Sequence, residues 1–169
     1  MRNRPPRSSP SRSPIAHAVV RSRPRGFSVT ELVAVVAIIG LLASIALPTY
    51  RAHVLRANRA DARTALLTLA AAQEKFHLQC NAYAAALDET RDTTCNPASL
   101  RFSRSAERGQ YTLAVTSADA AAWTATATAV DGKPQAMDTR CRVFQLTSTG
   151  VMSAKQADGA ANDLECWSR

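Results

Sequence analysis

Four cysteines and one histidine carry the side chains best suited to bonding or metal chemistry. Cys80, Cys95, Cys141 and Cys166 make an even count, and in an oxidising compartment they should form two disulfides in one of three pairings. His77 lies three residues before Cys80, so a zinc site is the alternative. The spacing of 15 residues to Cys95 lacks the paired cysteine knuckle of such sites, and oxidation would remove the thiolates. We therefore predict two disulfides, no metal and no cofactor.

Other groupings that support catalysis are missing from the sequence. It has no phosphate-binding glycine loop, no nucleophile elbow and no His-Glu-x-x-His run. Its three histidines are too far apart to serve one triad convincingly. The acidic cluster Asp88, Glu89 and Asp92 is interpreted as a solvated loop in preference to a calcium site. We expect a protein that is not an enzyme.

The basic residues suggest a nucleic-acid partner, but most of the net charge is confined to the N-terminus. The formal charge is +8, and seven of the 21 lysines and arginines lie in residues 1–26, which leaves 14 against 13 acidic residues. If the later arginines converge with Phe102 or Tyr111, they could bind phosphates beside stacked bases. Scattered solubilising arginines are the alternative. The candidates are Arg101, Arg104, Arg108, Arg140 and Arg142.

One glutamate interrupts an apolar segment near the N-terminus. Between Phe27 and Tyr50 the only charged side chain is Glu31. As a helix this stretch would measure about 36 Å, enough to cross a hydrocarbon core of about 30 Å. The arginines before it predict a cytoplasmic N-terminus and a translocated, periplasmic remainder. Glu31 is either a functional group inside the membrane or an acid at the headgroup level.

The residues around that glutamate carry a resemblance. Arg25 to Glu31, reading RGFSVTE, and the apolar run to Pro48 resemble the class III signal of type IV pilins and pseudopilins. The resemblance implies that a prepilin peptidase cuts after Gly26 and methylates the amine of Phe27. It further implies that Glu31 pairs with the Phe27 amine of a neighbouring subunit, which offsets the cost of a lone carboxylate in an apolar bundle.

The C-terminal part of the chain adds a second resemblance. DTRC at 138–141, LTSTG at 146–150 and the closing Cys166-Trp167 resemble the signature of PilE-type minor pilins. Together with locality, the bridged C-terminal loop of that family favours the pairs Cys80–Cys95 and Cys141–Cys166. Gly40 and Pro48 are weak points of the first helix, where the family's filaments often unwind; a kink at Pro48 is the alternative.

A helix and three strands are predicted beyond the membrane segment. Residues 51–79 favour an amphipathic helix, and 110–117, 123–130 and 142–148 alternate with period two as strands do. Asp131-Gly132 and Gly150 predict turns with positive φ. The expected fold is α+β, a long N-terminal helix packed on a small antiparallel sheet, as in type IV pilins. The predicted apolar stripe of the helix is Leu55, Ala62, Leu66, Leu69 and Phe76.

Four segments organise the chain. Residues 1–26 form a basic leader, which is long enough that Val19 or Val20 is a candidate start. Residues 27–50 form the transmembrane and filament-core helix, and 51–79 the amphipathic helix. Residues 80–169 form the head, with a connecting loop over 79–109, the sheet and a C-terminal disulfide loop.

The expected function is that of a minor structural subunit of a type IV pilus that supports assembly, adhesion or motility. Its expected partners are other pilins, the prepilin peptidase, the inner-membrane assembly platform and, before assembly, membrane lipid. It would be a single-pass inner-membrane protein with a periplasmic head, and then part of a cell-surface pilus. The alternatives are a type II secretion pseudopilin and a DNA-binding minor pilin for transformation.

Overall fold

The computed structural model describes residues 26–168, which divide into two compact units. One unit ends at Leu41 and the other begins at Leu42. The leader and its candidate starts at Val19 and Val20 lie outside the described residues, apart from Gly26. Helix α1, Val29–Cys80, has residues in both units, and each unit is considered below by itself.

In the N-terminal unit, helix α1 is apolar and its side chains are exposed. Large side chains such as Leu32 and Ile39 are 61% and 59% exposed. The apolar window of α1 has a mean hydropathy of 2.5 and is, by length and composition, sufficient to cross a membrane. The helix continues through Gly40 and also through Pro48. Whether either position unwinds in a filament stays a prediction.

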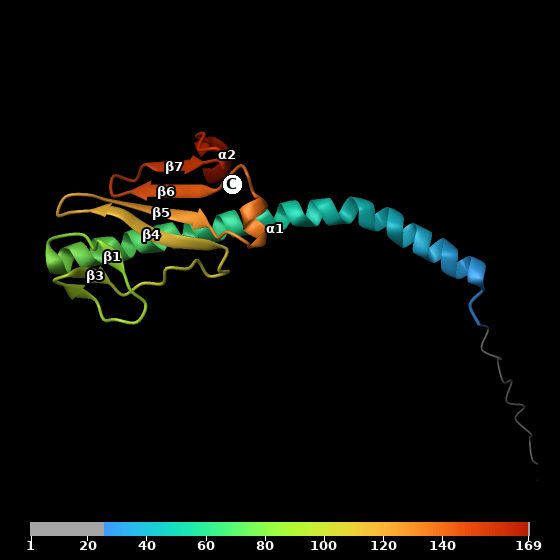
Figure 1. Cartoon of the computed structure of the whole chain (residues 1–169), viewed down its shortest axis with the longest axis horizontal. Coiled ribbons are helices and arrows are strands. Elements are labelled where there is room, and N and C mark those ends of the chain that lie inside the picture. Colours follow the sequence, from blue (N-terminus) through green and yellow to red (C-terminus); the bar gives the residue numbers. More distant parts are fainter. Residues whose placement is uncertain (1–25, 169) are drawn as a thin grey trace, which may run out of the picture. The chain divides into compact units, whose positions relative to one another are not determined.

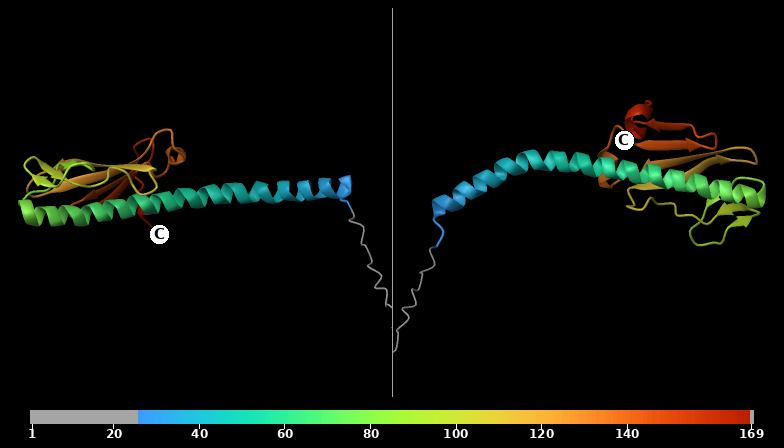
Figure 2. Two further views of the ribbon diagram at one scale, coloured as in Figure 1. Left: turned by 90° about the horizontal axis from the view of Figure 1, so that it is seen from below. Right: turned by 180° about the vertical axis from the view of Figure 1, so that it is seen from behind.

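In the second unit, α1 buries one stripe against a sheet (Figures 1 and 2). Ala62, Leu66, Leu69 and Phe76 are at most 1% exposed, and Leu55 is half-buried. Positions three or four apart lie on one helix face, which explains why the stripe is continuous. The predicted amphipathic helix is confirmed.

The sheet that receives this stripe is an antiparallel meander in the order β4-β5-β6-β7. Alternation places one set of side chains on the helix and the other toward solvent. In β5 the tryptophan and alanines are buried, while the threonines between them are partly or fully exposed. The strands are β4 Tyr111–Ala118, β5 Trp123–Ala129, β6 Val143–Thr147 and β7 Met152–Lys155.

Aromatic rings fill the core beside the small alanines of β5. Tyr111 and Phe144 meet edge to face with ring centroids 5.6 Å apart, and Trp167 meets Phe144 in the same way at 5.6 Å. Such pairs contribute about 1 kcal/mol beyond the area that they bury. Trp167, near the C-terminus, is thereby fixed to the sheet.

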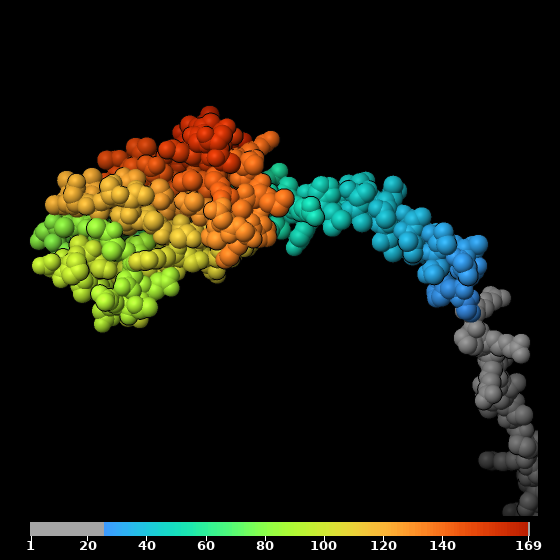
Figure 3. Space-filling view, in the orientation of Figure 1, coloured from blue at the N-terminus to red at the C-terminus, as the bar shows by residue number. Residues whose placement is uncertain are grey.

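The segment after α1 is more ordered than the sequence suggested. Residues 79–109 were expected to be a connecting loop, but they contain a small sheet in the order β1-β3-β2, which lies beside the main sheet (green in Figure 3). Buried Gln73 donates to the Ala84 carbonyl at 2.9 Å and accepts from the Ala84 amide at 2.9 Å. The strands are β1 Ala86–Leu87, β2 Thr94–Cys95 and β3 Ala98–Leu100.

Short elements also occupy the turns and the C-terminal region. A 3-10 helix, η1, covers Pro134–Met137, and helix α2 covers Asp163–Trp167. Strand β7 and α2 fall where a C-terminal loop was expected. Gly132 and Gly150 both have φ of 78°, so the predicted positive-φ turns are confirmed. With these additions, the predicted α+β fold is confirmed.

Replacement of the buried stripe residue Leu66 by alanine should cost about 3 kcal/mol of unfolding free energy, since it leaves a cavity between α1 and the sheet. The matched control is Leu67→Ala, because Leu67 is the next residue and is 48% exposed; its effect should stay within about 0.5 kcal/mol. Urea unfolding of the full chain in neutral detergent, followed by tryptophan fluorescence, measures both. Equal losses in the two variants would contradict the packing described here.

Candidate functional site

The predicted processing residues lie at the start of the first helix. Gly26 and Phe27 precede α1, and Phe27 is 85% exposed. Glu31 lies in the first turn and is also exposed, and its carboxylate makes no hydrogen bond or ion pair within residues 26–168. An exposed carboxylate of this kind is free to meet a charge on another subunit. Cleavage, methylation and that pairing stay predictions.

The two disulfides follow the preferred pairing, Cys80–Cys95 and Cys141–Cys166. The first ties the end of α1 to β2, and the second ties the segment before β6 to α2. Cys80 therefore has no thiolate to share with His77. The His77 ring instead stacks on Tyr83 with a centroid distance of 4.4 Å.

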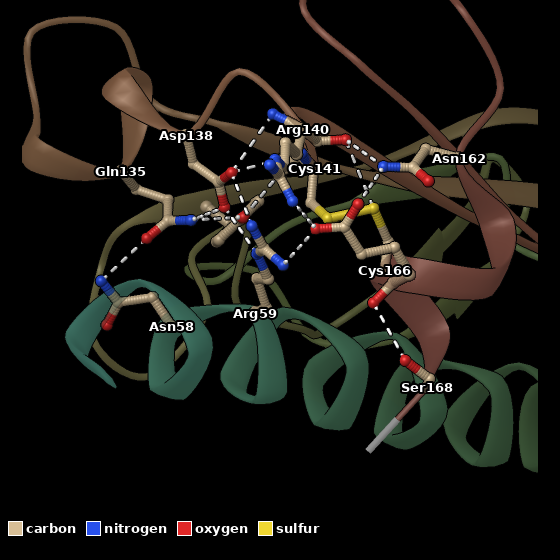
Figure 4. Close-up of polar contacts among 11 residues, drawn as sticks. Asn58, Arg59, Gln135, Asp138, Arg140, Cys141, Asn162, Cys166 and Ser168 are labelled. Atoms are coloured by element: carbon tan, nitrogen blue, oxygen red, sulfur yellow. Dashed lines mark hydrogen bonds and ion pairs between the residues drawn. A yellow bond between two sulfur atoms is a disulfide. The ribbon is translucent and has the colours of Figure 1, made fainter. Parts of the chain in front are cut away.

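The second bridge lies beside a buried charged network centred on Asp138 (Figure 4). Arg59 of α1 donates two hydrogen bonds to the Asp138 carboxylate, at 2.7 and 2.8 Å. The side chains of Arg59 and Asp138 are only 14% and 2% exposed. The hydrogen bond to Asp138 raises the pKa of Arg59 above its usual value, against the lowering effect of burial. The paired charges thus hold the η1 region against the helix.

A chain of neutral hydrogen bonds extends this network. Fully buried Gln135 donates to Asp138 at 2.8 Å and to the Tyr111 hydroxyl at 2.9 Å, and accepts from Asn58 at 3.0 Å. The Tyr111 hydroxyl donates in turn to the Cys141 carbonyl at 3.0 Å. Burial, followed by the Asp138 charge, raises the pKa of Tyr111. Asn58, Arg59 and Gln135 were absent from the predicted site residues, and Asp138 was noted in the sequence only as part of the DTRC signature.

The sequence contained a signal for this network. In the predicted apolar stripe, two pairs of consecutive members are seven positions apart: Leu55 and Ala62, and Leu69 and Phe76. Arg59 and Gln73 lie between the members of these pairs, on the same helix face. A polar residue on a buried helix face needs a hydrogen-bond partner. Arg59 and Gln73 therefore indicated polar contacts between the helix and the head.

The two aromatic residues considered beside the five arginines do not offer open rings. Tyr111 is fully buried and its hydroxyl is bonded, so it offers no face on which a base could stack. Phe102 is partly buried and packs on the core. Within the described residues, the arginines differ in how far acids neutralise them.

Acidic partners neutralise three of those arginines. Arg101 pairs with exposed Asp92, and Arg142 pairs with Asp131. Arg140 pairs with Glu165 at 2.9 Å, and this bond is the main reason that the pKa of Glu165 lies below its usual value. These three arginines therefore contribute little positive charge that is available to a ligand.

Three basic side chains form no ion pair within residues 26–168. They are those of Arg104, Arg108 and Lys133, and we call them the loop cations. The carboxylates of Glu89 and Asp61 accept from the backbone amides of Arg104 and Arg108, at 2.6 and 3.0 Å. The Arg104 guanidinium donates to the Leu87 carbonyl, at 2.8 Å, and the Lys133 ammonium group donates to the Gly109 carbonyl. This contact joins the loop before β4 to the loop after β5, so Lys133 lies next to the residue that follows Arg108. The sequence had not suggested Lys133, because it is a lone lysine far along the chain from Arg108.

Asp138→Asn should lower the free energy of unfolding by about 3 kcal/mol, because the buried Arg59 charge loses its partner. Asp92→Asn removes the acid of an exposed pair and should cost less than about 1 kcal/mol. Urea unfolding in neutral detergent compares them. If Asp138→Asn cost no more than this control, the network would not hold η1 on the helix.

Comparisons with known proteins place this geometry in a family. A family model described as type IV minor pilin ComP, DNA uptake sequence receptor, matches residues 48–145, which include the loop cations. The type IV major pilin protein PilA of Myxococcus xanthus (strain DK1622) is 43% identical over 61 residues, 36% of this chain and 28% of that protein. Both matches agree with a non-enzymatic structural subunit. With its apolar helix, helix-on-sheet head and two disulfides, the chain belongs to the type IV pilin family and is a minor pilin.

Proposed function

We propose that this minor pilin is a DNA receptor on a type IV pilus. The observation that carries the proposal is the group of loop cations, Arg104, Arg108 and Lys133, whose charged side-chain groups form no salt bridge among the described residues; the guanidinium of Arg104 and the ammonium group of Lys133 donate to backbone carbonyls. Phosphate oxygens are natural acceptors for such groups, and phosphate contacts supply much of the affinity for DNA. The name of the matching family, a DNA uptake sequence receptor, supports the same function. Among the alternatives from the sequence, it favours DNA binding over adhesion and over a secretion pseudopilin.

The proposed ligand is double-stranded DNA. Proteins that bind single strands combine cations with exposed aromatic faces on which bases stack. Here Tyr111 is buried and Phe102 packs on the core, so neither of the candidate aromatics offers such a face. Loop arginines and a lysine suit the phosphate backbone and the groove edges of a duplex.

Removal of two loop cations tests this function. The variant Arg104→Gln with Arg108→Gln should weaken duplex binding by at least about tenfold near 0.1 M salt and lower the salt slope by about 2. The matched control, Lys75→Gln with Arg91→Gln, removes two exposed cations elsewhere and should bind as the parent does. Fluorescence anisotropy of a labelled duplex, with the full chain in neutral detergent, measures both. The leader arginines are present in all variants, so their contribution to the affinity cancels in the comparison. Equal weakening in the control would mean that the duplex is held only by nonspecific electrostatic attraction, and it would reject the site.

Assembly is proposed to depend on the N-terminal residues. In this proposal a prepilin peptidase cuts after Gly26 and methylates Phe27, while α1 anchors the chain in the inner membrane with its head in the periplasm. Glu31 then pairs with the Phe27 amine of a neighbour as α1 enters the filament on the cell surface. Its exposure and its lack of a partner within residues 26–168 support this role.

Glu31→Gln should leave cleavage intact and remove the chain from filaments, since the amide has no charge to offer the amine. Mass spectrometry of sheared filaments and of membranes should find the methylated peptide beginning at Phe27 in both fractions for the parent. For the variant it should be found in membranes only. Glu74→Gln, on an exposed part of the same helix, is the control. Normal incorporation of the Glu31 variant would refute the pairing.

A further inference from the structure

We propose that a cleft at the base of the head binds the phosphate group of an anionic phospholipid before the subunit enters a filament. The inference rests on the proposed membrane-anchored stage, and it concerns residues other than the loop cations. The cleft, called here the Arg56 cleft, consists of two adjoining hollows of about 300 and 270 Å³. Both are lined by Arg56, Arg59 and Glu165.

The charges of the cleft leave one guanidinium open. Arg59 is bonded to Asp138 and lies 3.8 Å from Glu165, which also accepts from Arg140. Arg63 donates to the carbonyls of Trp167 and Ser168, at 3.0 and 2.6 Å. These partners fix the walls of the cleft.

The Arg56 side chain, in contrast, is exposed and makes no hydrogen bond or ion pair within residues 26–168. Its charge is therefore available to an anion from outside the chain. Arg63 forms no salt bridge within the described residues, but its guanidinium is bonded to the two backbone carbonyls, so Arg56 is the open guanidinium and Arg63 adds positive charge beside it.

The position of Arg56 along α1 suits a lipid headgroup. Arg56 follows Tyr50 by six residues in one helix, a rise of about 9 Å. The headgroup layer extends roughly 5 to 8 Å beyond each side of the hydrocarbon core. Helical side chains point back toward the N-terminus, so the Arg56 side chain is directed toward the apolar segment, consistent with Ala52 in the lining of the cleft. A guanidinium that reaches back in this way would meet the phosphate layer.

The rim of the cleft carries one highly exposed apolar side chain, Met137, which is 79% exposed and lines the first hollow. Leu164 of α2 and Tyr50 of α1 do not line the cleft, but they are also exposed, at 90% and 69%. Aromatic and apolar side chains beside arginines are typical of surfaces that lie in the membrane interface. This rim favours a lipid over a free phosphate ion as the occupant.

An anionic lipid suits the site better than a zwitterionic one. Phosphatidylcholine carries its own cation, which would lie near Arg56 and Arg63. Phosphatidylglycerol offers the phosphate without that charge. An arginine near an anionic membrane surface contributes enough attraction for a preference of about fivefold.

Native mass spectrometry of the full chain in neutral detergent, with phosphatidylglycerol or phosphatidylcholine added, tests the site. The parent should retain phosphatidylglycerol about fivefold more than phosphatidylcholine, and Arg56→Gln should abolish that preference. Arg91→Gln, which removes an exposed guanidinium from the 79–109 segment, is the charge-matched control and should retain it. An unchanged preference in Arg56→Gln, or its loss in the control as well, would overturn the proposal.

Three further measurements separate the possible sources of failure. Inorganic phosphate at the same concentration should not displace the lipid, and displacement would reassign the cleft to a free anion. Flotation with phosphatidylcholine vesicles should recover the parent and Arg56→Gln equally, and failure of both would reject the membrane-anchored stage itself. Duplex binding by Arg56→Gln should equal that of the parent, so loss of DNA binding in the loop-cation variant and loss of lipid preference here are independent results.

Discussion

The structure of the head depends on the neutralisation of one arginine. Arg59 lies on the helix face that is otherwise apolar and buried, and a guanidinium there would be costly without a partner. Asp138 supplies the opposite charge from a segment 79 residues further along the chain. The pair therefore fixes where the polypeptide between β5 and β6 must lie.

Several other features follow from that position. Asn58 donates a hydrogen bond to Gln135 once η1 lies on the helix. The Tyr111 hydroxyl then accepts from Gln135 and donates to the Cys141 carbonyl. Cys141 is then held where it forms its disulfide with Cys166. This disulfide holds α2 beside α1, and residues of both helices line the Arg56 cleft. Lys133 immediately precedes η1, so the same anchor places it near Arg108. A structural ion pair thus positions both surfaces to which binding is assigned here.

The site was only partly predictable. Residue types and spacing indicated which arginines lie in the head. How much positive charge each one leaves available to a ligand depends on neighbouring side chains, which no local pattern reveals. Asp92 and Asp131 form salt bridges with Arg101 and Arg142, while the guanidinium groups of Arg104 and Arg108 form none within the described residues. Tyr111 alternates correctly within its strand, yet that same alternation turns it into the core and away from any ligand.

Several features could be predicted because they depend on local patterns of residues. These are the apolar segment with Glu31 near its start, the amphipathic stripe of α1, the three longest strands and the two positive-φ glycine turns, because composition and periodicity act over a few neighbouring residues. Tertiary structure alone decided the small sheet after α1, strand β7, the partner of Arg59 and the meeting of Lys133 with the loop of Arg108. Each of these results from contacts between distant segments, and the free energy of such contacts arises only when the helix and the sheet pack together.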